Sequence, residues 1–316
     1  MKLHNKLGRL GFGALHFNEN SAFFLKGLNL LNRDAHTFID CAPYYAANQC
    51  FQNLQKIIKK NQSLKLTLAV KCGLKSKIKN GNHVSLPSRY LVSDLENIIK
   101  TVKHPDFCRC SFIFQFHQLE LKPNKDFLIK LSKAIKDRQF EGVGVANCNL
   151  HDFYWCLKIF KAYEIPFRTF QIHANILEQK HAIKLCKLLM KYNITPVFNR
   201  VLARGALAYN TLKEIPPLNS RIVKSNRIKK WISNEKKSRL EQFWKFCDKE
   251  EVGYVEFAIG YLLKRFVKSI ILVASPKEKK SLKGLKKAVN FRLNSRRCAF
   301  AEKLHLRTFP RYYFEK

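Results

Sequence analysis

Acidic residues are scarce in this chain, which has 23 Asp and Glu against 59 Lys and Arg and a formal net charge of +36 at pH 7. Such a field attracts nucleic acids, anionic membranes and phosphorylated ligands at low salt. The lysines, however, are spread along the chain without interleaved aromatic residues, and none of the usual nucleic-acid recognition motifs is present. We therefore expect a basic protein without a specific nucleic-acid partner.

Long apolar segments are also missing. No stretch approaches the roughly 20 apolar residues that span a bilayer, so we expect no membrane partner. The first residues, MKLHNKLGRLGFGAL, contain neither the apolar core of about 7–15 residues nor the small-residue cleavage site of a secretory signal. These features favour a cytoplasmic location.

Metal-binding and linker patterns are missing as well. The ten cysteines are scattered, with one CxC pair at Cys108 and Cys110 and no CxxC pair, so we expect neither a metal site nor a disulfide scaffold. No linker rich in Pro, Gly or Ser divides the chain, and no internal repeat is evident. We expect residues 1–316 to form a single domain.

The sequence does contain a regular alternation of apolar runs and amphipathic stretches, which is typical of βα units and a parallel sheet. The apolar runs predict eight strands, at Leu7–Phe12, His36–Ile39, Leu66–Val70, Ser111–Phe116, Gly142–Val145, Arg168–Ile172, Ile194–Phe198 and Ser269–Val273. Apolar residues at helical spacing predict helices at Ala22–Leu31, Cys50–Ile58, Leu91–Val102, Phe127–Ile135, Phe153–Tyr163, His181–Met190, Leu240–Asp248, Tyr254–Lys264 and Lys279–Val289.

Eight strands separated by helices close naturally into an α/β fold of the (β/α)8 barrel type, which typically takes about 250 residues. The competing architecture is an open doubly wound sheet, which normally carries a G-x-G-x-x-G fingerprint after its first strand. The segment GRLGFGAL does not fit that fingerprint. We therefore predict a TIM-type barrel, with its active site at the carboxyl ends of the strands.

Four polar residues follow the second, third and fourth of these strands. They are Asp40 and Tyr45 in FIDCAPYY, Lys71 in LTLAVKCG and His117 in SFIFQFHQ. A phenol has a pKa near 10 and donates a proton poorly at neutral pH unless a cation lies beside it. Lys71 would supply that cation and Asp40 would hold it, while His117 would bond the substrate oxygen or relay a proton. The pattern predicts a catalytic group in which Tyr45 protonates a carbonyl oxygen.

The chain resembles the aldo-keto reductase superfamily through most of its length. The resemblance rests on LGFGAL, FIDCAPYYAANQ, LAVKCG, SFIFQFHQLE, GVGVANCN, FQIHANILEQ and NITPVFNRVLARGAL, and on the family's spacing of Asp, Tyr, Lys and His. It implies a barrel that binds a nicotinamide cofactor, usually NADPH, without a separate dinucleotide-binding domain. Hydride would pass from the nicotinamide to a carbonyl carbon while Tyr45 protonates the oxygen.

The resemblance also implies cofactor contacts. Asn147 and Gln171 match residues that bond the nicotinamide carboxamide, and Gly13 matches a position where the backbone approaches the cofactor. The segment VASPKEKKSLKGLKK corresponds to the family's adenosine-phosphate loop and the helix after it. In this segment, the candidates to bind a 2′-phosphate are Ser275, Lys277 and Lys280. They favour NADPH as the cofactor, and NADH is left open.

Several positions depart from the family pattern. Ala146 replaces the serine that usually precedes the asparagine, and Ala46 replaces the glycine that usually follows the tyrosine. Asn199-Arg200-Val201 stands where the family has aromatic-Ser-Pro after the seventh strand, and Leu285 stands where it has an adenine-contacting asparagine. These changes bear on cofactor affinity, whereas the catalytic quartet is intact. Arg200, at the cofactor side of the site, also has the forked shape that binds a carboxylate or phosphate.

Substrate choice in the family depends on loops at the catalytic rim. Candidates for the pocket lining are Phe12, His16, Tyr44, Phe309, Tyr312 and Tyr313. His16, Asn199 and Arg200 would suit a sugar or an acid, so we favour a charged small-molecule carbonyl substrate. The alternative function is a weakly catalytic or non-catalytic protein that binds cofactor to regulate a partner, as the auxiliary potassium-channel subunits of this superfamily do. The sequence does not determine the oligomeric state.

Overall fold

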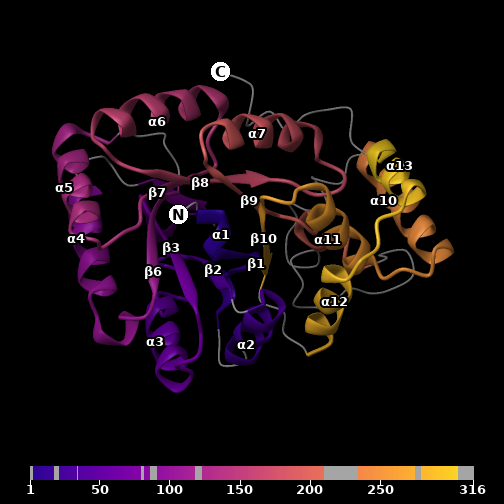
Figure 1. Cartoon of the computed structure of the whole chain (residues 1–316), viewed down its shortest axis with the longest axis horizontal. Helices are drawn as coiled ribbons and strands as arrows, with labels where there is room; N and C mark the ends of the chain where they lie inside the picture. Colours follow the sequence, from indigo (N-terminus) through magenta and orange to yellow (C-terminus); the bar gives the residue numbers. More distant parts are fainter. Residues whose placement is uncertain are drawn as a thin grey trace.

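Eight parallel strands form a closed barrel at the centre of the computed structural model, which describes residues 3–17, 21–33, 35–79, 82–85, 91–117, 123–209, 234–274 and 279–304 (Figure 1). The order around the barrel follows the chain, and the last strand pairs with the first. The predicted (β/α)8 fold is confirmed. The strands are β1 (Leu7–Gly13), β2 (His36–Cys41), β3 (Leu66–Cys72), β6 (Ser111–Phe116), β7 (Val143–Ala146), β8 (Phe167–His173), β9 (Thr195–Asn199) and β10 (Ile270–Ala274).

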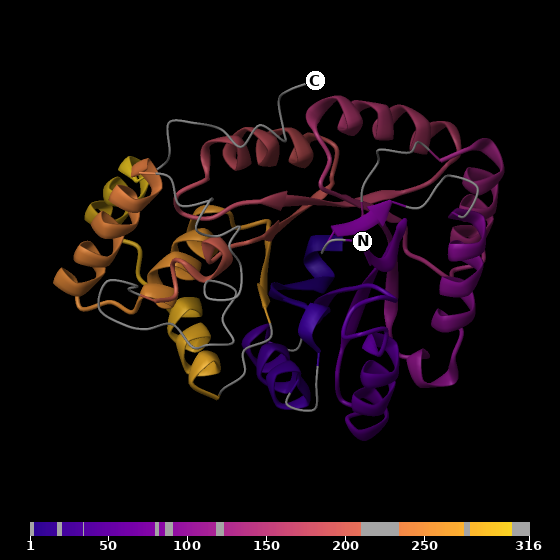
Figure 2. The same ribbon diagram turned by 180° about the vertical axis from the view of Figure 1, so that it is seen from behind.

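Helices surround the strands in both views of the molecule (Figures 1 and 2). Every helix predicted from apolar spacing is present, although α10 begins well before its predicted start. The helices are α2 (Ser21–Leu31), α3 (Cys50–Lys60), α4 (Leu91–Val102), α5 (Lys125–Lys136), α6 (Leu150–Ala162), α7 (Lys180–Lys191), α10 (Asn234–Lys249), α11 (Tyr254–Arg265), α12 (Lys279–Val289) and α13 (Ser295–Lys303). None of the helices in the described ranges is both long and apolar enough to cross a bilayer.

Two α-helices and one hairpin had no counterpart in the sequence prediction. One is α13, and another is an antiparallel hairpin of β4 (Leu74–Lys79) and β5 (Asn82–Ser85) that follows β3. The third is the short helix α1 (Leu3–Lys6), which lies within the ring of strands (Figure 1). Lys6 bonds Ser111 Oγ at 2.5 Å and the carboxylate of Glu141, so α1 is attached to the amino end of the barrel.

Alternate residues of each strand face the barrel interior, since side chains along a strand repeat with a period of two. Inside lies a small apolar cluster that includes Leu3 of α1 and residues of several strands, among them Phe38, Ala69, Ile113, Val197 and Ile270. Two residues further along four of these strands stand polar residues, namely Asp40, Lys71, Gln115 and Asn199. An apolar layer at the amino end is therefore followed by a polar layer at the carboxyl end.

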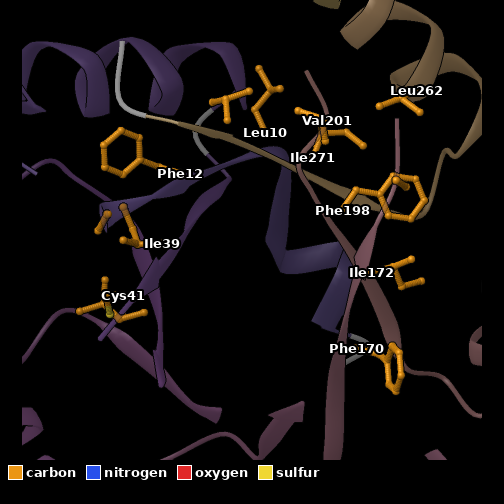
Figure 3. Close-up of a cluster of buried hydrophobic side chains, with 14 of the residues drawn as sticks. Leu10, Phe12, Ile39, Cys41, Phe170, Ile172, Phe198, Val201, Leu262 and Ile271 are labelled. Atoms are coloured by element: carbon orange, nitrogen blue, oxygen red, sulfur yellow. The ribbon is translucent and has the colours of Figure 1, made fainter. Parts of the chain in front are cut away.

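The larger hydrophobic core lies between the strands and the helices. Figure 3 shows part of it, with labelled side chains from β1, β2, β8, β9, β10 and α11. Ile39 and Cys41 flank Asp40 along β2 and belong to this outer core. Strand β2 is thus buried on both faces, as is usual for a strand of a parallel barrel.

A polar clamp joins α2 to an irregular part of β1. The register between β1 and β2 shifts between Leu7 and Gly11, so this stretch of β1 needs other partners. The side chain of Asn32 accepts from Leu10 N at 3.0 Å and donates to Leu10 O at 2.8 Å. Gly8 leaves the space for it, because a Cβ there would lie 2.0 Å from Asn32 Cγ. This clamp keeps β1 in the barrel next to β2.

Candidate active site

A buried ion pair with an attached phenol lies at the carboxyl ends of β2 and β3. Lys71 Nζ donates to Asp40 Oδ2 at 2.7 Å and to Tyr45 Oη at 3.1 Å. The three residues are only 4%, 6% and 6% exposed. The structure therefore brings three of the four predicted catalytic residues into one continuous contact.

The pleat of the two strands places the ion pair. Asp40 follows Phe38 by two residues and Lys71 follows Ala69 by two, so both polar side chains share the inner face with an apolar residue below them. Asp40 pairs with Ala69 in the β2–β3 register. Lys71 is thus one pleat nearer the rim than Asp40, and its long side chain spans that offset.

The loop that carries Tyr45 has an unusual backbone. Ala46, Ala47 and Asn48 have φ values of 51°, 53° and 69°, which lie in the left-handed region. Asparagine tolerates this region better than alanine does, and a left-handed alanine costs roughly 1–2 kcal/mol. The Cys50 amide donates to Tyr45 O at 3.2 Å where α3 begins. The loop turns sharply from β2 into α3, and Tyr45 lies at the bend.

The carboxylate of Asp40 depends on Lys71 for its stability. Its Oδ2 also accepts from Gln171 Nε2 at 3.4 Å, whereas Oδ1 is buried and has no hydrogen-bond partner among the described residues. A charge removed from water in this way is costly unless a countercharge compensates it. A cation held against a phenol oxygen also favours the phenolate, which is the form left after proton donation.

His117, the fourth predicted catalytic residue, joins this group through Tyr44. Its amide donates to Cys72 O at 3.1 Å just beyond β6, and its Nδ1 is hydrogen-bonded to the hydroxyl of Tyr44. Both residues are half-buried. Burial, followed by the charge of Tyr45, raises the pKa of Tyr44 well above its ordinary value. Tyr44, which sequence reasoning considered only as a pocket-lining residue, therefore contacts the histidine predicted to be catalytic.

The predicted cofactor residue Gln171 lies inside the barrel. It is 2% exposed, and its Oε1 accepts from Gln115 Nε2 at 3.4 Å. Sequence reasoning missed Gln115, although the signal was available. In SFIFQFHQ, the period of two places Gln115 on the same face as His117.

Asn147 connects two histidines at the rim. This exposed residue follows β7 with φ 54°, donates from Nδ2 to His117 O at 3.0 Å, and lies 3.1 Å from His173 Nε2 through its Oδ1. Burial, and then the nearby charges of Arg200 and Arg204, hold the pKa of His173 well below its usual range. A neutral His173 can donate its Nε2 proton to Asn147 Oδ1. His173 was also missed, because a lone histidine within an apolar strand gives no specific signal.

The other cofactor candidates are distributed around the rim. Gly13 ends β1, and a Cβ there would meet only Val273 O, at 3.9 Å, so packing within the described residues does not require glycine. Arg200 is exposed directly after β9 and has φ 55°. Lys280 lies in the first turn of α12. The remaining candidates lie outside what the structure describes. These are the residues Ser275, Lys277, Phe309, Tyr312 and Tyr313, and the side chains of Lys280 and His16.

The described part of this site contains no cluster of metal ligands and no disulfide. Within the described ranges, no three His, Cys, Asp or Glu side chains gather where a metal ion could bind. The ten cysteines are free thiols. The chemistry of the described rim therefore comes from hydroxyl, ammonium, carboxylate, imidazole and amide groups.

A sequence model of the aldo/keto reductase family matches residues 9–304. The fold is similar to that of an aldo-keto reductase from Bacillus halodurans in its holo form, with a TM-score of 0.69 and 15% identity, over 97% of this chain and 95% of that chain. A glycerol dehydrogenase from Gluconobacter oxydans gives 0.68 and 15%, over 94% of this chain and 90% of that chain. A thermostable aldo-keto reductase in complex with the inhibitor epalrestat gives 0.61 and 15%, over 94% of each chain. No curated protein sequence matches the chain.

Proposed function

Because this chain belongs to the aldo/keto reductase family, we propose that it is an NADPH-dependent reductase of an aldehyde, ketone or sugar carbonyl with Tyr45 as its proton donor. Family membership implies an oxidoreductase that uses a nicotinamide cofactor and a small-molecule carbonyl substrate. The proposal adds the preference for NADPH and a role for each residue of the site.

The contact of Lys71 with both Asp40 and Tyr45 is the observation that carries this proposal. A buried lysine is costly, and the 2.7 Å bond to Asp40 compensates its charge. The 3.1 Å bond to Tyr45 places the same cation on the phenol oxygen. A lysine that served packing alone would not need a phenol as its second partner. The arrangement supports a tyrosine that loses a proton during the reaction.

Each residue of the group has a distinct role in the proposed reaction. When bound, the nicotinamide supplies the hydride that reaches the carbonyl carbon. Tyr45 donates its proton to the carbonyl oxygen, and Lys71 stabilises the phenolate that remains. Asp40 fixes the position of Lys71, and His117 orients the carbonyl. Proton donation and charge stabilisation are thus divided between two residues in contact.

The rim has groups that fit the amide end of a nicotinamide. Asn199 Oδ1 and Asp40 Oδ1 are buried acceptors without hydrogen-bond partners among the described residues, and an amide NH₂ group is a donor that would satisfy such an atom. Asn147 and Gln171 would hold the carboxamide, and Gly13 leaves room for close approach. The 2′-phosphate of NADPH would be held by Ser275, Lys277 and Lys280 in the lysine-rich segment. Arg200, at the cofactor side of the rim, would also bond a charged substrate.

The test of the proton donor compares two tyrosine variants. Purified protein should oxidise NADPH when given reactive aldehydes, quinones, sugars or sugar derivatives. Tyr45→Phe should lose on the order of 10²–10⁴-fold in kcat, the usual effect of removing a proton donor. Tyr154→Phe removes the same atom from a side chain that is 49% exposed on α6 and should keep full activity. Equal rates for Tyr45→Phe and the wild type would refute the mechanism.

Cofactor preference requires a separate measurement. A double variant, Lys277→Ala and Lys280→Ala, should raise the KM for NADPH and leave the KM for NADH unchanged, because only NADPH has the 2′-phosphate. An equal change for both cofactors would contradict the assignment of these lysines to that phosphate. Arg200→Ala should weaken the binding of acidic substrates more than that of neutral ones.

A second candidate function is regulation through bound cofactor with little or no turnover. Two observations favour it: the amide groups of Gln171 and Asn147 are already hydrogen-bonded within the protein, and Ala146 lacks the hydroxyl common in the family. This candidate predicts that bound NADPH is oxidised no more than once per protein molecule. Repeated turnover with any carbonyl in the panel would exclude it.

We also propose that residues 1–316 form one domain in the cytoplasm. The pairing of β10 with β1 supports one domain, because the barrel closes only when its last strand pairs with its first. A single cooperative unfolding transition is therefore expected in urea. Two separate transitions would indicate a division of the chain.

A further inference from the structure

Tyr44 lies between Tyr45 and His117 and contacts both. Its hydroxyl is hydrogen-bonded to His117 Nδ1, and its side chain is also hydrogen-bonded to that of Tyr45. Its ring stacks near that of His117, with centroids 6.0 Å apart and planes at 14°, and meets the Tyr45 ring edge-on at 5.1 Å and 85°. One hydrogen-bonded chain therefore runs from Asp40 through Lys71, Tyr45 and Tyr44 to His117.

The turn after β2 makes this contact between neighbouring residues possible. Adjacent side chains in an extended strand point to opposite faces, so two successive tyrosines in a strand would not meet. Here the Tyr45 amide donates to Ala42 O at 3.1 Å, and the left-handed residues follow directly. The resulting bend brings both tyrosine rings near His117, which directly follows β6.

The protonation of Tyr44 suits it to transfer a proton. Its raised pKa keeps it a neutral phenol at neutral pH, with one proton to donate and an oxygen that can accept another. A hydroxyl of this kind can receive one proton while releasing another, without becoming an anion. His117 at the far end is half-buried, so its imidazole has access to solvent.

We propose that Tyr44 is a positioning residue that returns a proton from His117 to Tyr45 after each turnover. The proposal rests on the proposed role of Tyr45. During reduction, the O–H bond of Tyr45 breaks and its proton forms a new O–H bond on the former carbonyl oxygen, which leaves a phenolate beside Lys71. The phenolate takes the proton of Tyr44 while the Tyr44 oxygen takes the Nδ1 proton of a protonated His117. Water then reprotonates His117, so the alcohol product gains one proton from solvent.

The kinetic test uses Tyr44→Phe, which keeps the ring and removes only the hydroxyl. Steady-state kcat should fall by roughly tenfold, which is less than the 10²–10⁴-fold expected for loss of the proton donor itself. The kcat/KM for the carbonyl and the rate of the first turnover should stay unchanged, because Tyr45 begins each experiment with its proton, so KM should fall in proportion to kcat. Tyr154→Phe is the matched control and should change none of these quantities. The melting temperature of each variant shows that it is folded.

A second measurement does not depend on activity. NMR of the cofactor-free protein with ¹⁵N-labelled histidine reports the protonation and hydrogen bonding of each imidazole nitrogen. The Nδ1 signal of His117, assigned with a His117→Gln variant, should shift in Tyr44→Phe and stay in place in Tyr154→Phe. An unchanged signal in Tyr44→Phe would show that the bond to Nδ1 is not present in solution, and would overturn the proposal.

The remaining outcomes separate the relay from the proposed function. If Tyr45→Phe is inactive while Tyr44→Phe keeps its full steady-state rate, the relay is wrong and the proton donor stands. An equal slowing of the first and later turnovers in Tyr44→Phe would also overturn proton return. A gain in kcat/KM would mean that Tyr44 blocks the carbonyl position. If Tyr45→Phe keeps wild-type activity, the proposed function itself fails.

Discussion

Lys71 and Asp40 form a charge pair whose environment differs from that of the ion pairs on the surface. The pair is 2.7 Å long and nearly inaccessible to water. Lys130 and Glu96 form a pair of the same length with side chains that are 50% and 52% exposed. Exposed pairs contribute about 0–1 kcal/mol, because water screens them, whereas removal of one partner from a buried pair costs about 3–5 kcal/mol.

Lys71→Met should therefore reduce the free energy of unfolding by about 3–5 kcal/mol, since it leaves the Asp40 charge buried without its cation. The double variant Asp40→Asn, Lys71→Met should recover most of that loss, yet stay inactive because Tyr45 has no cation beside it. Lys130→Met, the control, should cost under about 1 kcal/mol. Urea denaturation and NADPH oxidation measure the two effects. A double variant as unstable as Lys71→Met, or one with wild-type activity, would contradict this account.

The order of polar residues at successive strand ends was enough to predict this pair and its tyrosine. The barrel rim brings together whatever follows the strands, so Asp40, Lys71 and Tyr45 had to be close. The contact of Tyr44 with His117 was not predictable in the same way. It depends on the direction of a side chain in a loop, and that direction is set by backbone angles that the sequence pattern does not reveal.

The connection from β2 to α3 is the element that positions both tyrosines, and it does so with a strained backbone. Two alanines adopt left-handed angles there, at Ala46 and Ala47. Strain of this kind persists only where the surrounding structure imposes it, and it is often found at functional sites. The Ala46 amide donates to Leu15 O at 3.2 Å, which attaches the loop to the turn that follows β1.

Ala47→Gly should stabilise the protein by about 0.5–1 kcal/mol. Glycine relieves a left-handed cost of roughly 1–2 kcal/mol but adds about 0.5–1 kcal/mol of chain entropy to the unfolded state. The methyl group of Ala47 is exposed, so little packing is lost. Ala134→Gly, at a buried position in the last turn of α5, should instead destabilise by about 1 kcal/mol or more. Urea denaturation of both variants checks the signs. A loss of stability in Ala47→Gly would mean that this loop is not strained.

Secondary structure was predictable where an element has a clear apolar period and was missed where the period is short or weak. The strands and their helices carry the apolar spacing that burial requires, and α4 and β6 have the predicted ends. The β4–β5 hairpin lies in a short lysine-rich stretch, although the Asn80-Gly81 pair between its strands in the sequence is a hairpin signal. Helix α13 has weak apolar spacing, and its start is marked by Asn294, whose side chain accepts from Arg297 N.

The whole molecule combines a large positive charge with histidines that resist protonation. At +36, each added proton is repelled by the charges already present. His36, His173 and His181 all have pKa values below the usual range, and burial is the largest cause in each case. His181 Nε2 lies 2.5 Å from the carbonyl oxygen of His173, a bond that the neutral imidazole can donate. The folded protein therefore takes up fewer protons in mild acid than the unfolded chain does.

Stability should consequently fall as the pH is lowered from about 7.5 to 5.5. Unfolded histidines have pKa values near 6.5, so the unfolded chain gains protons below that pH while the buried imidazoles stay neutral, and unfolding is favoured. Above pH 7 both states are neutral at these sites and the effect vanishes. Urea denaturation across this range should show a smaller acid loss for His173→Gln than for the wild type. His151→Gln, on the exposed face of α6, should match the wild type. An unchanged pH slope in His173→Gln would show that this imidazole is protonated in the fold, and the bond it donates to Asn147 would then have to be reassigned.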